Sequence, residues 1–350
     1  MPGNLMIRKT IDIVGQRILP VSILILFSLT ALRGQDIHFS LFNACPLYLN
    51  PANTGNFNGD WRLSGIYRNQ WTALADPFST AAAGFDKQFY WLNQNLSFGL
   101  AFINDESGSL SLFVNKLYGS LGYARIINHH EIRLGLQIGY VLKSLNYASL
   151  TLPNQWDQET GGFNTSISSG ELNMGDRRSY PDCNVGILWK KKIKIIEPEI
   201  GLAFSHLNQP NESFFNDTQR LPIRSTLHAT LKTRIGEEFY IKPALLYMNH
   251  KGATETIVGL ITGFNVFGQN SGVKELNAAV YLRNGFFNQS DALALSVGAT
   301  FRRFDFAICY DYSISGLKAS AGNMGGFEIS LQYKSISTVL NSYSIPCERF

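Results

Sequence analysis

Few residues in this sequence are of types that could do chemistry, and they are scattered. The adjacent His129 and His130 are the side chains best suited to metal binding, but no further ligand accompanies them. None of the common catalytic signatures occurs: there is no H-E-x-x-H, G-x-S-x-G, phosphate-binding loop or G-x-G-x-x-G. The sequence therefore predicts a protein that is not an enzyme and that uses no metal or cofactor.

The chain contains four cysteines, too few for a disulfide scaffold in 350 residues. Cys45 and Cys347 lie near the two ends of the chain, and a disulfide bond between them is one possibility. Cys183 and Cys309 are expected to pack on a wall of the fold without a chemical role.

The charge distribution argues against a nucleic-acid partner. The formal net charge is +4, but the first 34 residues carry +3 of it, and the remainder has 26 basic and 25 acidic residues. A basic turn runs from Lys190 to Lys194, and it is expected either to be solvated or to contact an acidic partner surface. No basic patch of the kind that binds nucleic acid is evident.

Composition limits the elements that can position these residues. Hydrophobic residues make up 45% of the chain and aromatic residues 13%, but only 16% are charged, and there are 31 glycines. A soluble domain usually carries about 25% charged residues. The apolar content excludes disorder, and the combination favours a sheet with one apolar face.

The first 34 residues have the pattern of a secretory signal peptide. A polar, basic stretch is followed by an uncharged run over residues 18–32 and then by Arg33-Gly34. A spanning helix needs about 20 apolar residues, so an N-terminal anchor helix is the less favoured alternative. Cleavage is predicted between Gly34 and Gln35.

From residue 60 onward, apolar residues alternate with small or polar ones at the period of a β-strand. Phe304, Phe306 and Ile308, for example, alternate with Asp305 and Ala307. The pattern predicts 14 strands, over residues 60–70, 79–89, 95–104, 112–127, 131–145, 182–190, 196–205, 223–235, 239–248, 255–266, 275–283, 292–302, 304–313 and 326–335.

Connection lengths favour an outer-membrane barrel over a soluble all-β fold. Most even-numbered connections are tight turns, whereas the two longest connections, 146–181 and 206–222, are odd-numbered. We therefore predict an all-β transmembrane β-barrel of about 14 antiparallel strands over residues 60–335. An even count predicts that both termini are periplasmic, with an N-terminal segment at 35–59 and a C-terminal tail at 336–350.

One motif precedes the first predicted strand, and another lies at its end. Residues 46–55 read PLYLNPANTG, and residues 68–71 read RNQW. With these motifs the sequence strongly resembles the PorP/SprF family of type IX secretion system membrane proteins from Bacteroidetes. The chain ends in Cys347-Glu348-Arg349-Phe350, with Glu348 where the family usually has proline.

The resemblance implies an outer-membrane barrel that works in type IX secretion, which exports adhesins and gliding-motility proteins. The implied partners are outer-membrane lipid, secretion components in the periplasm and an exported cargo protein. The candidate partner-docking or family-motif residues are Pro46, Leu47, Tyr48, Asn50, Pro51, Gly55, Arg68, Asn69, Trp71, Cys347, Arg349 and Phe350.

Several of these residues also have a purely structural interpretation. Pro51 biases Asn50 towards an extended conformation, so the pair is expected either to shape a turn into the barrel or to dock a partner. Arg68 is expected to face the lumen, where it could pair with an acid or with a plug carbonyl. Trp71 is expected in an aromatic girdle.

The leading functional hypothesis is a barrel that binds or tethers exported cargo and docks to periplasmic machinery. The alternative is an outer-membrane channel or hydrophobic-solute transporter, and a surface adhesin barrel is a third interpretation. Residues 35–59 are enough to fill part of a lumen but too few to build a large plug.

Overall fold

The computed structural model describes residues 37–338 with internal gaps at 71–77, 92–93, 108–111, 146–152, 159, 165, 167–176, 215–217, 267–271, 285–289 and 315–323. The predicted signal peptide, Trp71, Cys347, Arg349 and Phe350 therefore lie outside the described residues.

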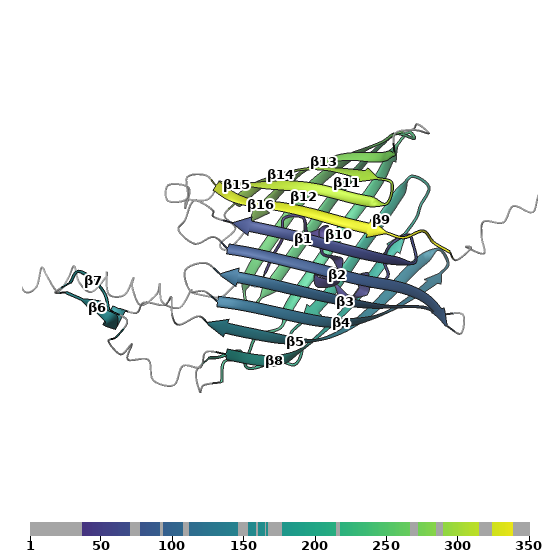
Figure 1. Cartoon of the computed structure of the whole chain (residues 1–350). Helices are drawn as coiled ribbons and strands as arrows, with labels where there is room; N and C mark the ends of the chain where they lie inside the picture. Colours follow the sequence, from purple (N-terminus) through teal and green to yellow (C-terminus); the bar gives the residue numbers. More distant parts are fainter. Residues whose placement is uncertain are drawn as a thin grey trace, which may run out of the picture. The chain divides into compact units, whose positions relative to one another are not determined.

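A closed antiparallel barrel dominates the described chain (Figure 1). Its strands are β1 Trp61–Gln70, β2 Phe78–Trp91, β3 Gln94–Ser107, β4 Leu112–Ile127, β5 His130–Leu145, β8 Arg177–Lys191, β9 Ile196–Ser205, β10 Arg224–Ile235, β11 Phe239–His250, β12 Ala253–Asn265, β13 Val273–Asn284, β14 Ser290–Phe301, β15 Phe304–Ser313 and β16 Met324–Lys334. Each strand pairs with its neighbour in sequence, and β1 pairs with β16 to close the barrel. The predicted fold class and all 14 strands are confirmed, although β8 begins at Arg177 instead of residue 182.

Three small elements that the structure describes between β5 and β8 are not part of the barrel sheet. The connection between β5 and β8 contains a 3-10 helix, η4 Pro153–Gln155, and two paired strands, β6 Trp156–Asp157 and β7 Gly162–Phe163. No helix in the described part of the chain is long and apolar enough to cross a membrane.

Alternation along each strand separates an outer from an inner face. On β1, Leu63 and Tyr67 are 47% and 42% exposed, whereas Arg62 and Arg68 are 4% and 3% exposed. A charge facing lipid at mid-depth costs about 2–4 kcal/mol, so barrels keep such residues inside. The apolar outer face is thus suited to lipid, and the charged inner face needs internal partners.

The two rims differ in the lengths of their connections. Six connections form one rim, at 92–93, 128–129, 192–195, 236–238, 266–272 and 302–303, and we call it the short-turn rim. The other rim holds the connections 146–176, 206–223 and 314–323 among its seven, and we call it the long-connection rim. β1 begins at the short-turn rim.

The chain before β1 fills part of the barrel interior, and we call residues 37–59 the luminal segment. It contains three short helices: η1 Phe42–Ala44, α2 Pro46–Leu49 and η2 Pro51–Asn53. Leu47 is 1% exposed, and Asn50, Ala52 and Thr54 are fully buried. This part of the interior is therefore packed by the chain's own N-terminal region.

The luminal segment runs from one rim to the other. His38 lies 3.6 Å from Glu255, near the start of β12 at the long-connection rim. At the other end, Gln88 and Ser335 contact residues 57–61 at the short-turn rim. This luminal path differs from the periplasmic location predicted for residues 35–59. An even strand count fixes where β1 begins, but it does not fix the route of the chain that precedes it.

Candidate functional site

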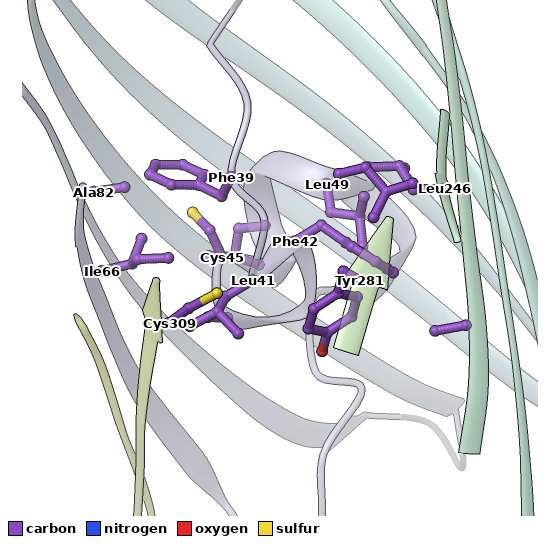
Figure 2. Close-up of a cluster of buried hydrophobic side chains, with 14 of the residues drawn as sticks. Phe39, Leu41, Phe42, Cys45, Leu49, Ile66, Ala82, Leu246, Tyr281 and Cys309 are labelled. Atoms are coloured by element: carbon purple, nitrogen blue, oxygen red, sulfur yellow. The ribbon is translucent and has the colours of Figure 1, made fainter. Parts of the chain in front are cut away.

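The apolar half of the luminal segment packs against the barrel wall. Figure 2 shows side chains from the segment beside wall residues of several strands. The segment contributes Phe39, Leu41, Phe42, Cys45 and Leu49, and the wall contributes Ile66, Ala82, Leu246, Tyr281 and Cys309. Cys45 is a free, buried cysteine in this cluster, and its possible partner Cys347 lies outside the described residues.

Beside this apolar cluster, a second group of residues holds the backbone of the segment. We call it the ionic cluster and define it as Ser40, Arg68, Arg283, Asp311 and Glu328. The backbone N–H groups of Ser40 and Leu41 donate to the two carboxylate oxygens of Glu328, at 2.7 and 2.8 Å. The hydroxyl of Ser40 donates to Asp311 at 2.9 Å. One carboxylate thus captures two consecutive backbone donors of the segment.

Two arginines balance the two carboxylates of the ionic cluster. Arg68 and Arg283 each lie 2.8 Å from the same oxygen of Asp311, and Arg68 also pairs with Glu328. Asp311 and Glu328 have no exposed surface, and Arg68 is 3% exposed. Buried charges must be paired to avoid a large desolvation cost. The four side chains come from β1, β13, β15 and β16, so barrel closure is what assembles them.

Asn50 holds the middle of the segment. Its Nδ2 donates to the carbonyl of Ile187 at 3.2 Å and lies 3.1 Å from Nε2 of His228. Its Oδ1 accepts from the backbone N–H of Ala52 at 2.8 Å, which caps η2. The backbone of Asn50 is extended (φ −160°, ψ 124°), as expected for a residue before proline. Asn50 therefore both shapes the turn and binds the wall.

A row of small residues lets the segment approach the wall, and we call it the glycine wall. Ser97 pairs with Gly122, Gly122 with Gly135, Gly135 with Gly186, and Gly186 with Ala203, across β3, β4, β5, β8 and β9. A Cβ on Gly135 would lie 2.1 Å from the carbonyl carbon of Pro51. On Gly186 it would lie 1.9 Å from Oδ1 of Asn50. Only glycine permits this contact.

Arg133 and Asp86 bind the backbone at the end of the motif. Arg133 donates to the carbonyls of Ala52 and Thr54 at 3.3 and 2.8 Å. Asp86 accepts from the backbone N–H of Gly55 at 2.7 Å and forms an ion pair with Arg62 at 2.8 Å. Gly55 has φ +74°, a left-handed conformation that favours glycine.

The structure brings most of the sequence-predicted residues together inside the barrel. Pro46 and Pro51 begin α2 and η2, and both are buried. Leu47 accepts a hydrogen bond from Gln137 at 3.1 Å. Tyr48 accepts from Arg224 at 2.8 Å, and that guanidinium lies 4.9 Å from the ring centre.

Asn69 lies apart from the luminal contacts. It is half-buried on β1, and its Nδ2 donates to the hydroxyl of Tyr67 at 3.4 Å. The structure therefore joins Arg68 to the segment but leaves its neighbour in the RNQW motif on the strand.

Two residues of these sequence features, Lys190 of the basic turn and His130 of the histidine pair, have partners. Lys190 donates to the side chain of Asn56 at 2.7 Å and pairs with Glu131 at 3.1 Å. His130 accepts from the Trp189 indole at 2.9 Å. Within the described ranges, no group of three or more His, Cys, Asp or Glu side chains is arranged to hold a metal ion.

Sequence reasoning missed the wall residues that hold the segment, above all Arg133, Arg283, Asp311 and Glu328. A signal existed, because each charge stands at an inward position of a strand with alternating apolar residues. What the segment would contact could not be read from that pattern.

The family model described as "Type IX secretion system membrane protein PorP/SprF" matches residues 31–333. No curated protein matches. Similar solved structures include the CymD monoaromatic hydrocarbon channel, at 10% identity and a TM-score of 0.48, covering 87% of this chain and 95% of that one. A Pseudomonas aeruginosa FadL homologue is also similar, at 10% identity and a TM-score of 0.42, with 81% and 92% covered.

Proposed function

Because this chain belongs to the PorP/SprF family of type IX secretion system membrane proteins, we propose that it binds or tethers exported cargo at the outer membrane and docks to the periplasmic machinery. The cargo class is that of adhesins or gliding-motility proteins. The barrel is the membrane anchor of this assembly, and its two rims are the surfaces that face partners.

The occupied lumen is the observation that carries this proposal. The luminal segment contacts the ionic cluster on one side and the glycine wall on another. Its central residues, from Leu47 to Thr54, include four with 1% exposure or less. A diffusion path through the barrel would require this packing to be broken. An anchor that works through its rims leaves the packing intact.

The short-turn rim offers the tail as a docking element. Ser335 accepts from the backbone N–H groups of Asp60 and Trp61 through its hydroxyl, at 3.0 and 2.9 Å. Thr338 donates to Asp60 from both its N–H and its hydroxyl. The root of the tail is therefore fixed beside the start of β1. We propose that this rim is periplasmic and that residues 336–350 engage the secretion machinery there.

The luminal location changes the role proposed for the motif at residues 46–55. A partner in the periplasm cannot reach buried Asn50 or Leu47 while the segment is seated. We therefore assign this motif to filling and bracing the barrel. The partner-binding role rests on the tail and on the long-connection rim.

Co-purification tests the proposal. A tagged full-length barrel, cross-linked in native outer membranes, should recover type IX secretion components together with an exported protein. A variant that lacks residues 342–350 should insert, keep its heat-modifiable migration and recover fewer of these components. If the truncated barrel inserts and still recovers every component, the docking role of the tail is wrong.

Conductance separates the anchor from the channel alternative. The purified full-length barrel should show no steady large conductance in planar bilayers, because the segment occupies the lumen. A steady open conductance would favour the channel or hydrophobic-solute transporter.

A further inference from the structure

An open cavity of about 570 Å³ lies at the short-turn rim, between two neighbouring turns. The turn between β12 and β13 and the first residues of β13 form one side through Gly272, Val273 and Lys274, and the turn between β14 and β15 forms the other through Arg302 and Arg303. Phe304 and Tyr333 also line the cavity. We call this cavity the basic groove.

The basic groove concentrates positive charge without a matching carboxylate. Lys274, Arg302 and Arg303 are exposed, and none of the described lining residues is acidic. The acids next in sequence are turned inward: Asp305 pairs with Lys334 at 2.5 Å, and Glu275 accepts from Tyr240 at 2.6 Å. The cations are therefore left to bind an anion from outside the described chain.

Aromatic contacts hold the two arginines at the edge of the groove. The guanidinium of Arg302 lies 5.4 Å from the ring centre of Phe301. Arg303 donates to the hydroxyl of Tyr333 at 3.4 Å, a long hydrogen bond. A guanidinium beside an aromatic ring retains free N–H donors, and its planar fork suits the oxygens of a phosphate.

The surface adjoining the groove is apolar and faces lipid. Phe304 is 37% exposed, Phe306 46% and Ile308 44% along β15, and Leu276 is 48% exposed on β13. A soluble anion gains nothing from this surface. A ligand with a charged head and an acyl chain can use both parts, because cations at the edge of an apolar band attract lipid headgroups.

We propose that the basic groove binds the phosphate headgroup of an anionic phospholipid from the surrounding leaflet. The two arginines and Lys274 contact the phosphate, and the acyl chains lie along the outer faces of β13 and β15. The inference rests on the barrel fold and does not depend on cargo binding.

The test measures phospholipid binding by native mass spectrometry of the full-length barrel in mixed micelles. The probe is phosphatidylglycerol, with phosphatidylcholine as the zwitterionic comparison and glycerol phosphate as the soluble phosphate. The variant is Arg302→Asn with Arg303→Gln, because Arg302 has φ +55° and Asn tolerates that conformation. Losing two interfacial cations should weaken phosphatidylglycerol binding about 30-fold.

The matched control is Lys192→Gln with Lys194→Gln, which removes the same charge from another turn of the same rim. It should change binding less than threefold. A second variant, Arg302→Lys with Arg303→Lys, keeps the charge without the planar fork and should weaken binding less than the Asn/Gln variant does, so that a folding defect is separated from loss of the site.

Three results would overturn the proposal. The first is equal weakening in the variant and the control, which would show a diffuse charge effect. The second is unchanged phosphatidylglycerol binding in the Asn/Gln variant, or a loss in the lysine variant as large as that in the Asn/Gln variant. The third is displacement of the lipid by an equal concentration of glycerol phosphate, which would show a site for soluble anions.

Discussion

The luminal segment is held by two regions of the barrel that use different physics. The ionic cluster holds Ser40 and Leu41 through charged side chains that reach inward from the wall. The glycine wall holds Pro51 and Ala52 because the wall has no side chains there. One region binds by charge, and the other binds by shape.

This difference predicts different consequences of mutation. A buried ion cluster is costly to disturb because removal of one charge leaves the others uncompensated. A close backbone contact fails when volume is added, and the cost depends on whether the neighbouring atoms can move.

Arg68→Met should have the largest effect. The substitution leaves Asp311 and Glu328 with only Arg283 to balance them, inside a region with almost no solvent exposure. Breaking a buried charge cluster in this way costs about 3–5 kcal/mol. Urea unfolding of the refolded barrel in micelles would measure the loss. Glu328→Gln, which keeps an acceptor for the segment, should cost less, and the reverse order would contradict the charge argument.

Gly135→Ala tests the glycine wall. The added Cβ would meet backbone atoms of Pro51 and Ala52 at 2.1 and 2.2 Å, and these atoms cannot rotate away. We expect a loss of about 1–3 kcal/mol in the free energy of unfolding. Proteolysis within residues 46–55 should become faster as the segment loosens.

Gly119→Ala is the control for that substitution. Gly119 lies on the outer face of the adjacent strand β4, where a Cβ would come no closer than 3.9 Å to any described atom. It should leave stability within about 0.5 kcal/mol of the parent. Equal losses at Gly119 and Gly135 would mean that strand propensity, not contact with the segment, sets the cost.

Ser97→Ala removes a single hydrogen bond from the same region. Ser97 donates to the carbonyl of Thr54 at 2.7 Å, but Arg133 donates to that carbonyl as well. The acceptor therefore keeps a partner, and the expected loss is about 0.5–1.5 kcal/mol. A loss as large as that for Arg68→Met would show that the glycine wall holds the segment through polar contacts and not through shape.

Much of the barrel could be predicted from the sequence, because strand alternation is a local property. Each of the 14 strands alternates within its own ten to sixteen residues, and Arg68 could be assigned to the inner face from its neighbours on β1. The extended Asn50 follows from the proline after it.

The occupant of the lumen could not be predicted in the same way. The four charged residues of the ionic cluster, Arg68, Arg283, Asp311 and Glu328, are separated by up to 260 residues in the chain. Arg68 and Glu328 come together only because β1 pairs with β16. The glycine wall depends on register across five strands, because a shift of one residue would turn Gly135 outward. Short helical turns such as η2 carry no periodic signal of their own.

We expect the smallest effect on stability at the end of the luminal segment, because Asp60 is exposed and lies outside the strands. Hydrogen bonds from the hydroxyl and the N–H of Thr338 hold the pKa of Asp60 below its ordinary value of 3.8. A lowered pKa means that this contact adds stability at neutral pH and loses it as the pH falls through the folded-state pKa.

Thr338→Val removes the hydroxyl donor and should raise the Asp60 pKa towards its ordinary value, with little change in stability at pH 7 because exposed contacts contribute little. A carboxylate titration by NMR would measure the shift, with Ser337→Ala as the control. If the pKa of Asp60 stays the same in Thr338→Val, the hydroxyl of Thr338 does not hold this carboxylate, and the root of the tail depends on Ser335 and on the backbone N–H of Thr338.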